Sequence, residues 1–294
     1  MKRLKYFLLI LLLPCIMHGQ DTKNLTLMTF NTHHCQGTDN VVDYTRVSNI
    51  IKAQNPNVVA LEELDSMTTR TSKVYQLDKL AQLTGMYATY GPAISFQGGK
   101  YGIGILSKEK PVSVKHIALP GSEARTLLVC EFTDYVYAAT HLALEQKNRN
   151  TSVDLIRQEA ATWTKPFFVA GDFNALPSSS EMATFRVYFK VLNDTSKYTY
   201  SSTSPTECID YIASFKLKNT NTVVSTKVID NAYASDHKAV VANINLQIAT
   251  GIGTVTQDKD KSDVYNLQGM KMTAKEENLD KGIYIVNRKK FLVN

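Results

Sequence analysis

The sequence predicts an α/β protein in which a mixed β-sheet assembly carries helices on its outer faces. Strand-like runs outnumber helical ones, hairpin-like pairs alternate with strand–helix–strand units, and several apolar strands end in polar side chains. The chain has 294 residues, of which 44% are hydrophobic, and this is enough to form a large core.

The first strand–helix–strand unit lies near the N-terminus. Leu25–Asn31 is strand-like and ends in a polar residue. Tyr44–Gln54 has apolar residues at the spacing of one helix face, and Asn55-Pro56-Asn57 ends that helix. Val58–Leu61 then predicts a buried strand that runs into Glu62-Glu63.

Residues 75–141 predict one helix followed by five strands. The amphipathic segment Tyr75–Leu83 is the helix, and Gly85 closes it. Glycine and proline turns separate the strands. The expected strands are Tyr87–Ile94, Tyr101–Leu106, Val112–Leu119, Arg125–Phe132 and Val136–Thr140, the last of which ends at His141.

The second half of the chain repeats the strand–helix–strand pattern. A helix over Thr151–Trp163 is followed by the short apolar strand Phe167–Ala170, which runs into Gly171-Asp172-Phe173-Asn174. Side chains alternate along a strand, so Asp172 and Asn174 are expected on one face. The remaining expected elements are a helix over Glu181–Tyr188 and strands over Cys208–Ile212 and Lys238–Leu246.

The N-terminal segment predicts export. Residues 1–19 combine a basic start with a short apolar run, which indicates a signal peptide rather than a membrane span. A lipoprotein anchor at Cys15 is the alternative, and Pro14 argues against it. We therefore expect a periplasmic, cell-surface or secreted protein with no transmembrane span in its mature chain.

Residues 250–294 differ in composition and in hydrophobic pattern from the middle of the chain. A charged linker precedes the short strand-like motifs VYNLQG (Val264–Gly269), GIYIV (Gly282–Val286) and FLVN (Phe291–Asn294). These motifs resemble C-terminal segments of exported Bacteroidetes-type proteins, which implies a sorting or anchoring role; the alternative is a β-hairpin extension of the main domain. The expected organisation is a signal peptide (1–19), a main domain (20–249) and this small β appendage (250–294).

Charge and cysteine content exclude some classes of function. The net charge is +6, but residues 2–5 carry three of those charges and residues 250–294 a net two, which leaves +1 for residues 20–249. The main domain therefore lacks the excess of basic residues that nucleic-acid-binding proteins usually have, although a local basic groove is still compatible with this charge. Cys35, Cys130 and Cys208 have no metal-binding spacing and are expected to be buried free thiols.

Polar residues at the ends of the predicted strands form the candidate site. Their side chains offer oxygen and imidazole ligands and no thiolate, which suits a hard cation such as Mg²⁺, Mn²⁺ or Ca²⁺. Two histidines among carboxylates suit acid–base chemistry on a phosphate ester. The set is Asn31, Glu63, His141, Asp172, Asn174, Asp210, Asp236 and His237.

Eight short motifs, in order, resemble the endonuclease/exonuclease/phosphatase superfamily, which includes DNase I-like nucleases, inositol polyphosphate phosphatases and sphingomyelinase-like phosphodiesterases. The resemblance implies a DNase I-like four-layer α/β/β/α sandwich with its site at one edge of the two packed sheets. The motifs are Thr29–Asn31 (TFN), Leu61–Leu64 (LEEL), Gly98–Ser107 (GGKYGIGILS), Ala124–Thr126 (ART), Thr140-His141, Gly171–Asn174 (GDFN), Ile209–Ile212 (IDYI) and Ser235–His237 (SDH).

The resemblance implies a role for each residue on the metal side of the site. Glu63 would be the main metal ligand, with Asn31 beside it. Asp236 would hold the metal or tune His237. Asp172 would position or activate the attacking water, or assist at the leaving group.

On the phosphate side, the resemblance implies that Asn174 holds the phosphate and His141 donates a hydrogen bond to it. His237, oriented by Asp210, would act as a base or stabilise the transition state. Two further candidates contact the phosphate in this scheme, Arg125 and Tyr101; their alternatives are a salt bridge with Glu123 and a place in the core.

The chain departs from the family pattern at two positions. Glu62-Glu63 stands where the family usually has Gln-Glu, and Lys238 stands where it often has proline. Period-two alternation puts Val59, Leu61 and Glu63 on one face and Glu62 on the other, so we assign the metal to Glu63.

These inferences together predict a secreted, divalent-metal-dependent phosphoester hydrolase: a phosphodiesterase, nuclease or phosphatase in which water attacks a metal-bound phosphate. Mg²⁺ is the expected cofactor, and a monomer is the expected state. The substrate stays open among a small phosphoester, an inositol phosphate, a lipid headgroup and a nucleic acid. The alternatives are a non-catalytic surface binding protein on a retained hydrolase scaffold and a metal-independent glycosidase that pairs Glu62 or Glu63 with Asp172.

Overall fold

The computed structural model describes residues 22–218, 221–248, 264–266, 272, 279, 281–286 and 289–293. The chain forms two compact units, one of which spans Lys23–Leu246, while the C-terminal strands belong to the other. The predicted signal peptide, residues 1–19, lies outside the described residues.

The first sheet of the large unit has six strands in the order β11-β12-β1-β2-β4-β3. At its centre β1 and β2 run parallel, and α1 (Tyr44–Gln54) connects them. The helix α2 (Gln76–Thr84) follows β2. The strands are β1 (Thr22–Asn31), β2 (Val58–Ser66), β3 (Tyr87–Phe96), β4 (Gly99–Ser107), β11 (Asn221–Val228) and β12 (Val240–Gln247).

The second sheet also has six strands, in the order β5-β6-β7-β8-β10-β9. Here β7 and β8 are the central parallel pair, and α3 (Gln146–Thr162) connects them. The helix α4 (Ser180–Tyr188) follows β8. The strands are β5 (Ser113–Leu119), β6 (Arg125–Glu131), β7 (Val136–His141), β8 (Phe167–Asp172), β9 (Phe189–Val191) and β10 (Asp210–Phe215).

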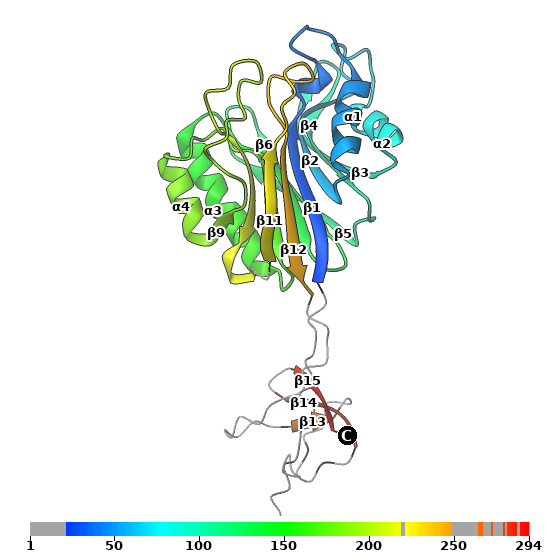
Figure 1. Ribbon diagram of the computed structural model, residues 1–294, viewed down its shortest axis with the longest axis vertical. Helices are drawn as coiled ribbons and strands as arrows, with labels where there is room; N and C mark the ends of the chain where they lie inside the picture. The colour runs from blue at the N-terminus through cyan, green and yellow to red at the C-terminus, as the bar shows by residue number, and fades with distance from the viewer. Residues whose placement is uncertain are drawn as a thin grey trace, which may run out of the picture. The chain divides into compact units, whose positions relative to one another are not determined.

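The two sheets pack face to face, and each carries its helices on the outside, as Figure 1 shows. Residues from both sheets form one buried cluster between them. A second cluster joins the outer face of the second sheet to α3 and α4, and a third joins the first sheet to α1 and α2. The predicted four-layer α/β/β/α sandwich is therefore confirmed.

Helix positions were predicted well, because apolar periodicity and end signals are local. The helix α1 has the predicted bounds; the side chain of Asp43 caps its start, and Asn55, in the left-handed region, ends it. The helix α3 begins at Gln146 rather than Thr151, because its first turn is polar and carries no apolar repeat.

Two strands were not predicted, and both lie at sheet edges. The strand β11 has mostly exposed or half-buried side chains, so its sequence lacks a strong apolar pattern. The strand β9 has three residues. Two short 3-10 helices, η1 (His33–Cys35) and η2 (Lys216–Lys218), were also absent from the prediction.

The C-terminal strands β13 (Val264–Asn266), β14 (Gly282–Val286) and β15 (Lys289–Val293) form an antiparallel sheet. Val264 and Tyr284 are its buried residues among those described. Residues 267–269 and 294 of the predicted motifs lie outside the described residues.

None of the described helices is both long and apolar enough to cross a membrane.

Candidate active site

The site is the polar end of the core between the two sheets. Along β1, Leu25 and Leu27 point into this core, and period two places Asn31 on the same face. In β8, Phe168 points into the same core, and period two places Asp172 on the face of Phe168. The other polar residues that continue this face are Glu62 in β2, Tyr101 in β4, His141 in β7 and Asp210 in β10.

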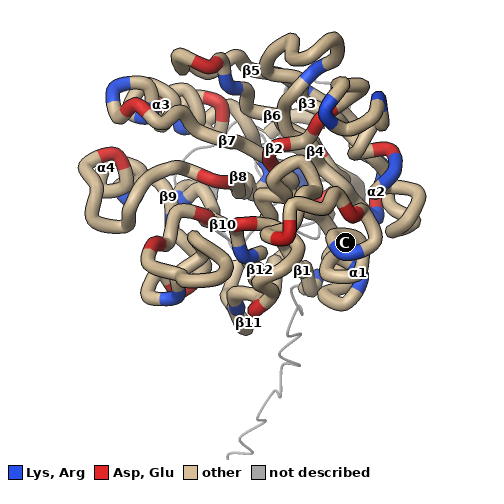
Figure 2. Tube along the Cα trace, turned by 90° about the horizontal axis from the view of Figure 1, so that it is seen from above, with Lys and Arg blue, Asp and Glu red and all other residues tan. Residues whose placement is uncertain are grey.

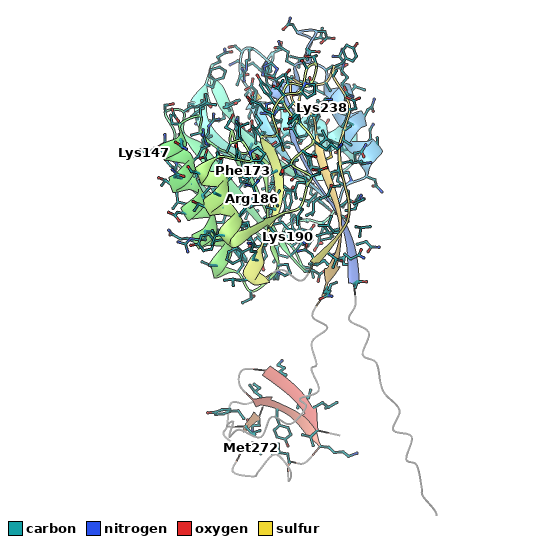
Figure 3. The ribbon with its side chains drawn as sticks, turned by 60° about the vertical axis from the view of Figure 1, so that its left-hand side comes forward. Lys147, Phe173, Arg186, Lys190, Lys238 and Met272 are labelled. Atoms are coloured by element: carbon teal, nitrogen blue, oxygen red, sulfur yellow. The ribbon has the colours of Figure 1, made fainter. Side chains whose placement is uncertain are left out.

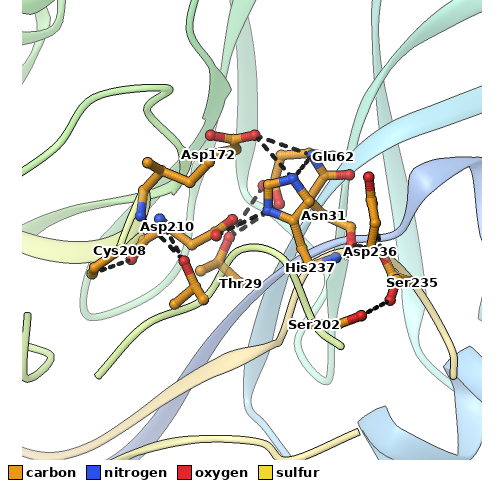
Figure 4. A network of polar contacts seen from close by, with 12 residues as sticks. Thr29, Asn31, Glu62, Asp172, Ser202, Cys208, Asp210, Ser235, Asp236 and His237 are labelled. Atoms are coloured by element: carbon orange, nitrogen blue, oxygen red, sulfur yellow. Dashed lines mark hydrogen bonds and ion pairs between the residues drawn. The ribbon is translucent and has the colours of Figure 1, made fainter. Parts of the chain in front are cut away.

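A buried ion pair joins the two sheets at this end. His237 Nδ1 lies 3.0 Å from Asp210 Oδ2, and both residues are buried (Figure 4). Ser235 holds His237 in place, because its hydroxyl accepts from the His237 backbone N–H and donates to the carbonyl oxygen of Asn31. The loop before β12 is thereby attached to the end of β1.

The GDFN motif positions Asp172 at the end of β8. The backbone N–H of Asn174 donates to Asp172 Oδ1 at 2.8 Å. Phe173, which is labelled in Figure 3, points the other way. It packs against Phe185 of α4 and Tyr211 of β10. Gly171 has φ +152°, and a Cβ there would lie 1.8 Å from the carbonyl oxygen of Thr140 in β7. The glycine thus allows β7 and β8 to approach at the site.

Asn31 lies at the centre of the cluster. Its Nδ2 is 3.1 Å from Glu63 Oε1, 3.1 Å from Asp172 Oδ2 and 3.4 Å from His237 Nε2. Its Oδ1 accepts from the backbone N–H of His33 at 3.1 Å, which fixes the orientation of the amide. As oriented, the amide therefore presents its nitrogen to the carboxylates.

The structure brings Glu63 to the site, as predicted, but period-two alternation is not the reason. Leu61 faces α1 and α2, and alternation alone would turn Glu63 the same way. A β-bulge between Leu61 and Leu64, with φ +60° at Glu63, reorients this side chain. Glu62, which follows Ala60 on the inter-sheet face, is fully buried and accepts from Thr29 Oγ1.

His141 and Arg125 form the second-sheet side of the site. Arg125 Nη1 lies 3.3 Å from His141 Nδ1 and 2.7 Å from Glu123 Oε1, so the predicted salt bridge coexists with the place of Arg125 in the site. His141 Nε2 lies 3.5 Å from Asp172 Oδ2. Tyr101 is nearly buried beside Arg125, and a small pocket is lined by Tyr101, Arg125 and His141.

Asn174 and Asp236 lie at the margin of the cluster. The Asn174 side chain donates to the carbonyl oxygen of Leu142 at 2.9 Å. The Asp236 carboxylate is partly exposed, and its Oδ1 lies 3.8 Å from His33 Nδ1. The structure thus places these two side chains near the site but outside the central group of Asp172, Asp210 and His237.

Burial and neighbouring charges shift four pKa values at the centre. Burial lowers the pKa of His237, but Asp210 and Asp172 outweigh this effect and raise the pKa to about 10. Burial, with the charge of Asp210, raises the pKa of Asp172 to about 7. Burial also raises the pKa of Glu62, and together with Arg125 it lowers the pKa of His141 well below its usual value. At neutral pH His237 is therefore the charged imidazole and His141 the neutral one.

The donor set fits a divalent cation. Asp and Glu residues lie at the ends of β2, β8 and β10 (Figure 2). The neighbouring arginines Arg125 and Arg70 are already paired with Glu123 and Asp65. Asp210 Oδ1 is buried and has no hydrogen-bond partner among the described residues. A bound cation would offset the excess of buried negative charge, and oxygen ligands of this kind suit Mg²⁺.

Sequence reasoning missed three residues that the structure brings to the site. Glu62 was assigned to the face opposite the site, but it follows Val58 and Ala60, which lie in the inter-sheet core. The run Val58–Leu61 is apolar at every position, so alternation could not show which face this was. His33 and His34 follow β1 directly and lie within 4.8 Å of Glu63, as measured between their ligand atoms. Two adjacent histidines directly after a strand are a sequence pattern that could have indicated their place in the site.

Residues 28–237 match the model of the Endonuclease/Exonuclease/phosphatase family. This match covers most of the chain, and the chain belongs to this family, whose members are phosphoester hydrolases. None of the curated protein sequences matches the chain significantly.

Solved structures of the same fold are similar at low sequence identity. An endonuclease/exonuclease/phosphatase from Beutenbergia cavernae has 19% identity and a TM-score of 0.65, with 85% of this chain and 87% of that chain covered. A mannosyl-6-phosphatase from Bacteroides thetaiotaomicron has 16% identity and a TM-score of 0.62, with coverage of 75% and 99%. D. rerio TDP2, solved with a single-strand DNA product, has 18% identity and a TM-score of 0.60, with coverage of 76% and 99%.

Proposed function

We propose that this protein is an exported, Mg²⁺-dependent phosphoester hydrolase whose general base is Asp172 and whose transition-state charge is stabilised by His237. The observation that carries the proposal is the buried chain of contacts from Asp210 through His237 to Asp172 and Asn31. Export rests on the basic and apolar start of the chain.

Asp172 has the properties of a base for water. Its pKa, raised to about 7, lets the carboxylate both ionise and accept a proton near neutral pH. Oδ1 is held by the backbone of Asn174, while Oδ2 lies among His141, His237 and Asn31. The proton taken from the attacking water would reside on Asp172.

His237 serves better as a cation than as a base. Its Nδ1–H donates to Asp210, and its Nε2 lies 3.7 Å from Asp172 Oδ2. Because its pKa is raised to about 10, the ring keeps its charge at neutral pH. An imidazolium in a buried site stabilises the negative charge that develops on a phosphate in the transition state.

His141 is a neutral donor for the phosphate. Arg125 Nη1 donates to His141 Nδ1, so the ring proton is on Nε2, which faces Asp172. Arg125 thereby sets the tautomer of His141 and adds positive charge to the second-sheet side of the site. Both groups could contact non-bridging oxygens of a phosphate.

Glu63 would hold the cation, with Asp172 close by. Asn31 would join them as a ligand only with its amide turned, because its Nδ2 now donates to both carboxylates and only its oxygen can bind a cation. A bound Mg²⁺ would polarise the phosphate and neutralise part of its charge. The excess of carboxylates supports this assignment, because an anionic phosphate would otherwise be repelled.

The experiment is product release from a panel of phosphoesters: a sugar phosphate, an inositol phosphate, sphingomyelin, single-stranded DNA and duplex DNA. The first three span small and lipid substrates; the DNA arms are included because a TDP2 structure with single-strand DNA product shares the fold. Each reaction is run with Mg²⁺ and with a chelator, and Asp172→Ala is the inactive control.

We expect turnover of one substrate class that requires Mg²⁺ and is lost in Asp172→Ala. Turnover that survives the chelator would overturn the metal assignment. Wild-type rates in a folded Asp172→Ala variant would overturn the assignment of the base. Saturable Mg²⁺ binding without turnover on any arm would favour the non-catalytic binding protein instead.

A further inference from the structure

The corner that follows β1 carries two histidines in an unusual backbone conformation. His33, His34 and Cys35 have φ values of +45°, +44° and +60°. Residues other than glycine seldom adopt the left-handed region, and three in succession persist only where surrounding contacts enforce them. Here Gln76 Nε2 donates to the carbonyl oxygen of His34, and the Asp43 N–H donates to that of Cys35.

This corner brings both imidazoles to Glu63. One ring nitrogen of His33, one of His34 and a carboxylate oxygen of Glu63 all lie within 4.8 Å of one another. The bulge at Glu63 turns its carboxylate toward the same place. Two unrelated backbone irregularities, one after β1 and one within β2, therefore converge on a single point.

The hydrogen bonds of His34 determine which of its nitrogens is free. Gln36 Nε2 donates to Asn40 Oδ1 at 3.0 Å, so Gln36 Oε1 is the atom that faces His34 Nε2 at 2.9 Å. An amide oxygen only accepts, and His34 Nε2 must therefore carry the ring proton. His34 Nδ1 then has a lone pair; it is buried and has no hydrogen-bond partner within the described part of the chain.

A neutral imidazole whose other nitrogen donates to a fixed acceptor is the arrangement that metal-ligating histidines adopt. The Nδ1 of His33 faces the Asp236 carboxylate at 3.8 Å from Oδ1, which is longer than a hydrogen bond. Two imidazoles and one carboxylate favour a borderline cation such as Zn²⁺ over Mg²⁺. Three protein ligands of this type leave one coordination position open.

We propose that His33, His34 and Glu63 form a second metal site, selective for a nitrogen-preferring divalent cation of the Zn²⁺ class. Glu63 is common to this site and to the Mg²⁺ centre proposed above, but the binding of Zn²⁺ does not depend on hydrolase activity. The open coordination position would accept water or an oxygen of a bound anion. Gln36 acts as a positioning residue for His34.

The test is a Zn²⁺ titration of the full-length ¹⁵N-labelled chain, followed by two-bond ¹H–¹⁵N correlations of the histidine rings. Without metal, the His34 ring should show the tautomer protonated at Nε2. With one equivalent of Zn²⁺, the ring signals of His33 and His34 should shift together, while those of the exposed His116 on β5 should not. His33→Gln and His34→Gln assign the two rings.

Zn²⁺ affinity provides the second readout. Gln36→Ala should weaken binding by roughly 10- to 100-fold, as expected for a group that orients a ligand, and His34→Gln should weaken it more. His116→Gln is the matched control and should bind Zn²⁺ as the wild type does. Because His33 is partly exposed, His33→Gln gives the same test if the buried His34 variant does not fold.

Two outcomes would overturn the proposal: a Zn²⁺-dependent shift confined to His237 or His116, or unchanged affinity in the folded His33→Gln variant. Asp172→Ala separates this proposal from the hydrolase assignment. It should abolish turnover and leave the shifts of His33 and His34 in place. Loss of those shifts in Asp172→Ala would place the bound Zn²⁺ in the central cluster and would likewise overturn the second site.

Discussion

In each sheet, two parallel strands at the centre are connected by a helix: β1 and β2 by α1 in the first sheet, and β7 and β8 by α3 in the second. A hairpin extends each sheet on one side, β4 with β3 and β6 with β5. The two sheets end differently at the site. The first ends in a bulge at Glu63 and a left-handed corner at His33, whereas β7 and β8 stay in regular register up to His141 and Asp172.

This difference separates the two halves of the chemistry. The irregular end offers ligand atoms from a bulge and a corner, which suits the binding of cations. The regular end offers side chains at fixed positions on one face, which suits proton transfer and phosphate contacts. Two contacts of the site join the two sheets: His237 with Asp210, and Asn31 with Asp172. Asn31 ends β1 and His237 precedes β12 of the first sheet, whereas Asp210 and Asp172 belong to the second.

The largest expected effect comes from breaking the pair between the sheets. His237→Gln removes the charge that faces Asp172, and turnover should fall by roughly 10²- to 10⁴-fold. His141→Gln removes a neutral donor and should lower turnover less. Steady-state rates at saturating Mg²⁺ check the order, with His116→Gln as the control. A larger loss in His141→Gln would reverse the roles that we assign to the two histidines.

The second effect concerns the close approach of β7 and β8. Gly171→Ala places a Cβ against the Thr140 carbonyl at a φ that favours glycine, and it should lower the free energy of unfolding by about 2–5 kcal/mol. Gly85→Ala is the matched control, since Gly85 has φ +70° but open space around it, and about 1 kcal/mol is expected there. Urea unfolding measures both. Equal losses in the two variants would show that the close approach of β7 and β8 adds nothing to the cost of the substitution at Gly171.

The third effect distinguishes the two adjacent glutamates of β2. Glu63→Gln should weaken Mg²⁺ binding by at least about 10-fold, because it removes a charged ligand. Glu62→Gln keeps the shape of a buried carboxyl whose pKa is raised, and it should leave stability unchanged or slightly increased. Calorimetric titration with Mg²⁺ and thermal unfolding of both variants test this. A stronger loss of Mg²⁺ affinity in Glu62→Gln would move the metal to the inter-sheet face.

The smallest effect is on the pH dependence of stability. The pKa of His237 is raised from 6.5 to about 10 in the folded state, so its contribution is complete below pH 6.5 and is lost as the pH rises toward 10. Asp172, raised from 3.8 to about 7, acts in the same direction over a lower range. In the presence of a chelator, Tm should fall as the pH rises from 7 to 10. His237→Gln should flatten this slope, and an unchanged slope in that variant would contradict the raised pKa.

Much of this protein follows from local sequence pattern. Apolar periodicity predicts α1 with its actual bounds, because helix spacing and end residues act within a few turns. The same reasoning predicts the central strands and finds their polar ends at Asn31, His141 and Asp172.

Tertiary structure decided which side chains reach the site where strand alternation alone could not. Glu63 reaches the site because pairing with β4 admits an extra residue, and a register shift depends on the partner strand rather than on β2 alone. His237 and Asp210 lie far apart in the chain, and the packing of two sheets brings them within 3.0 Å. The raised pKa values of His237 and Asp172 follow from that same packing, because burial and the proximity of charges exist only in the folded molecule.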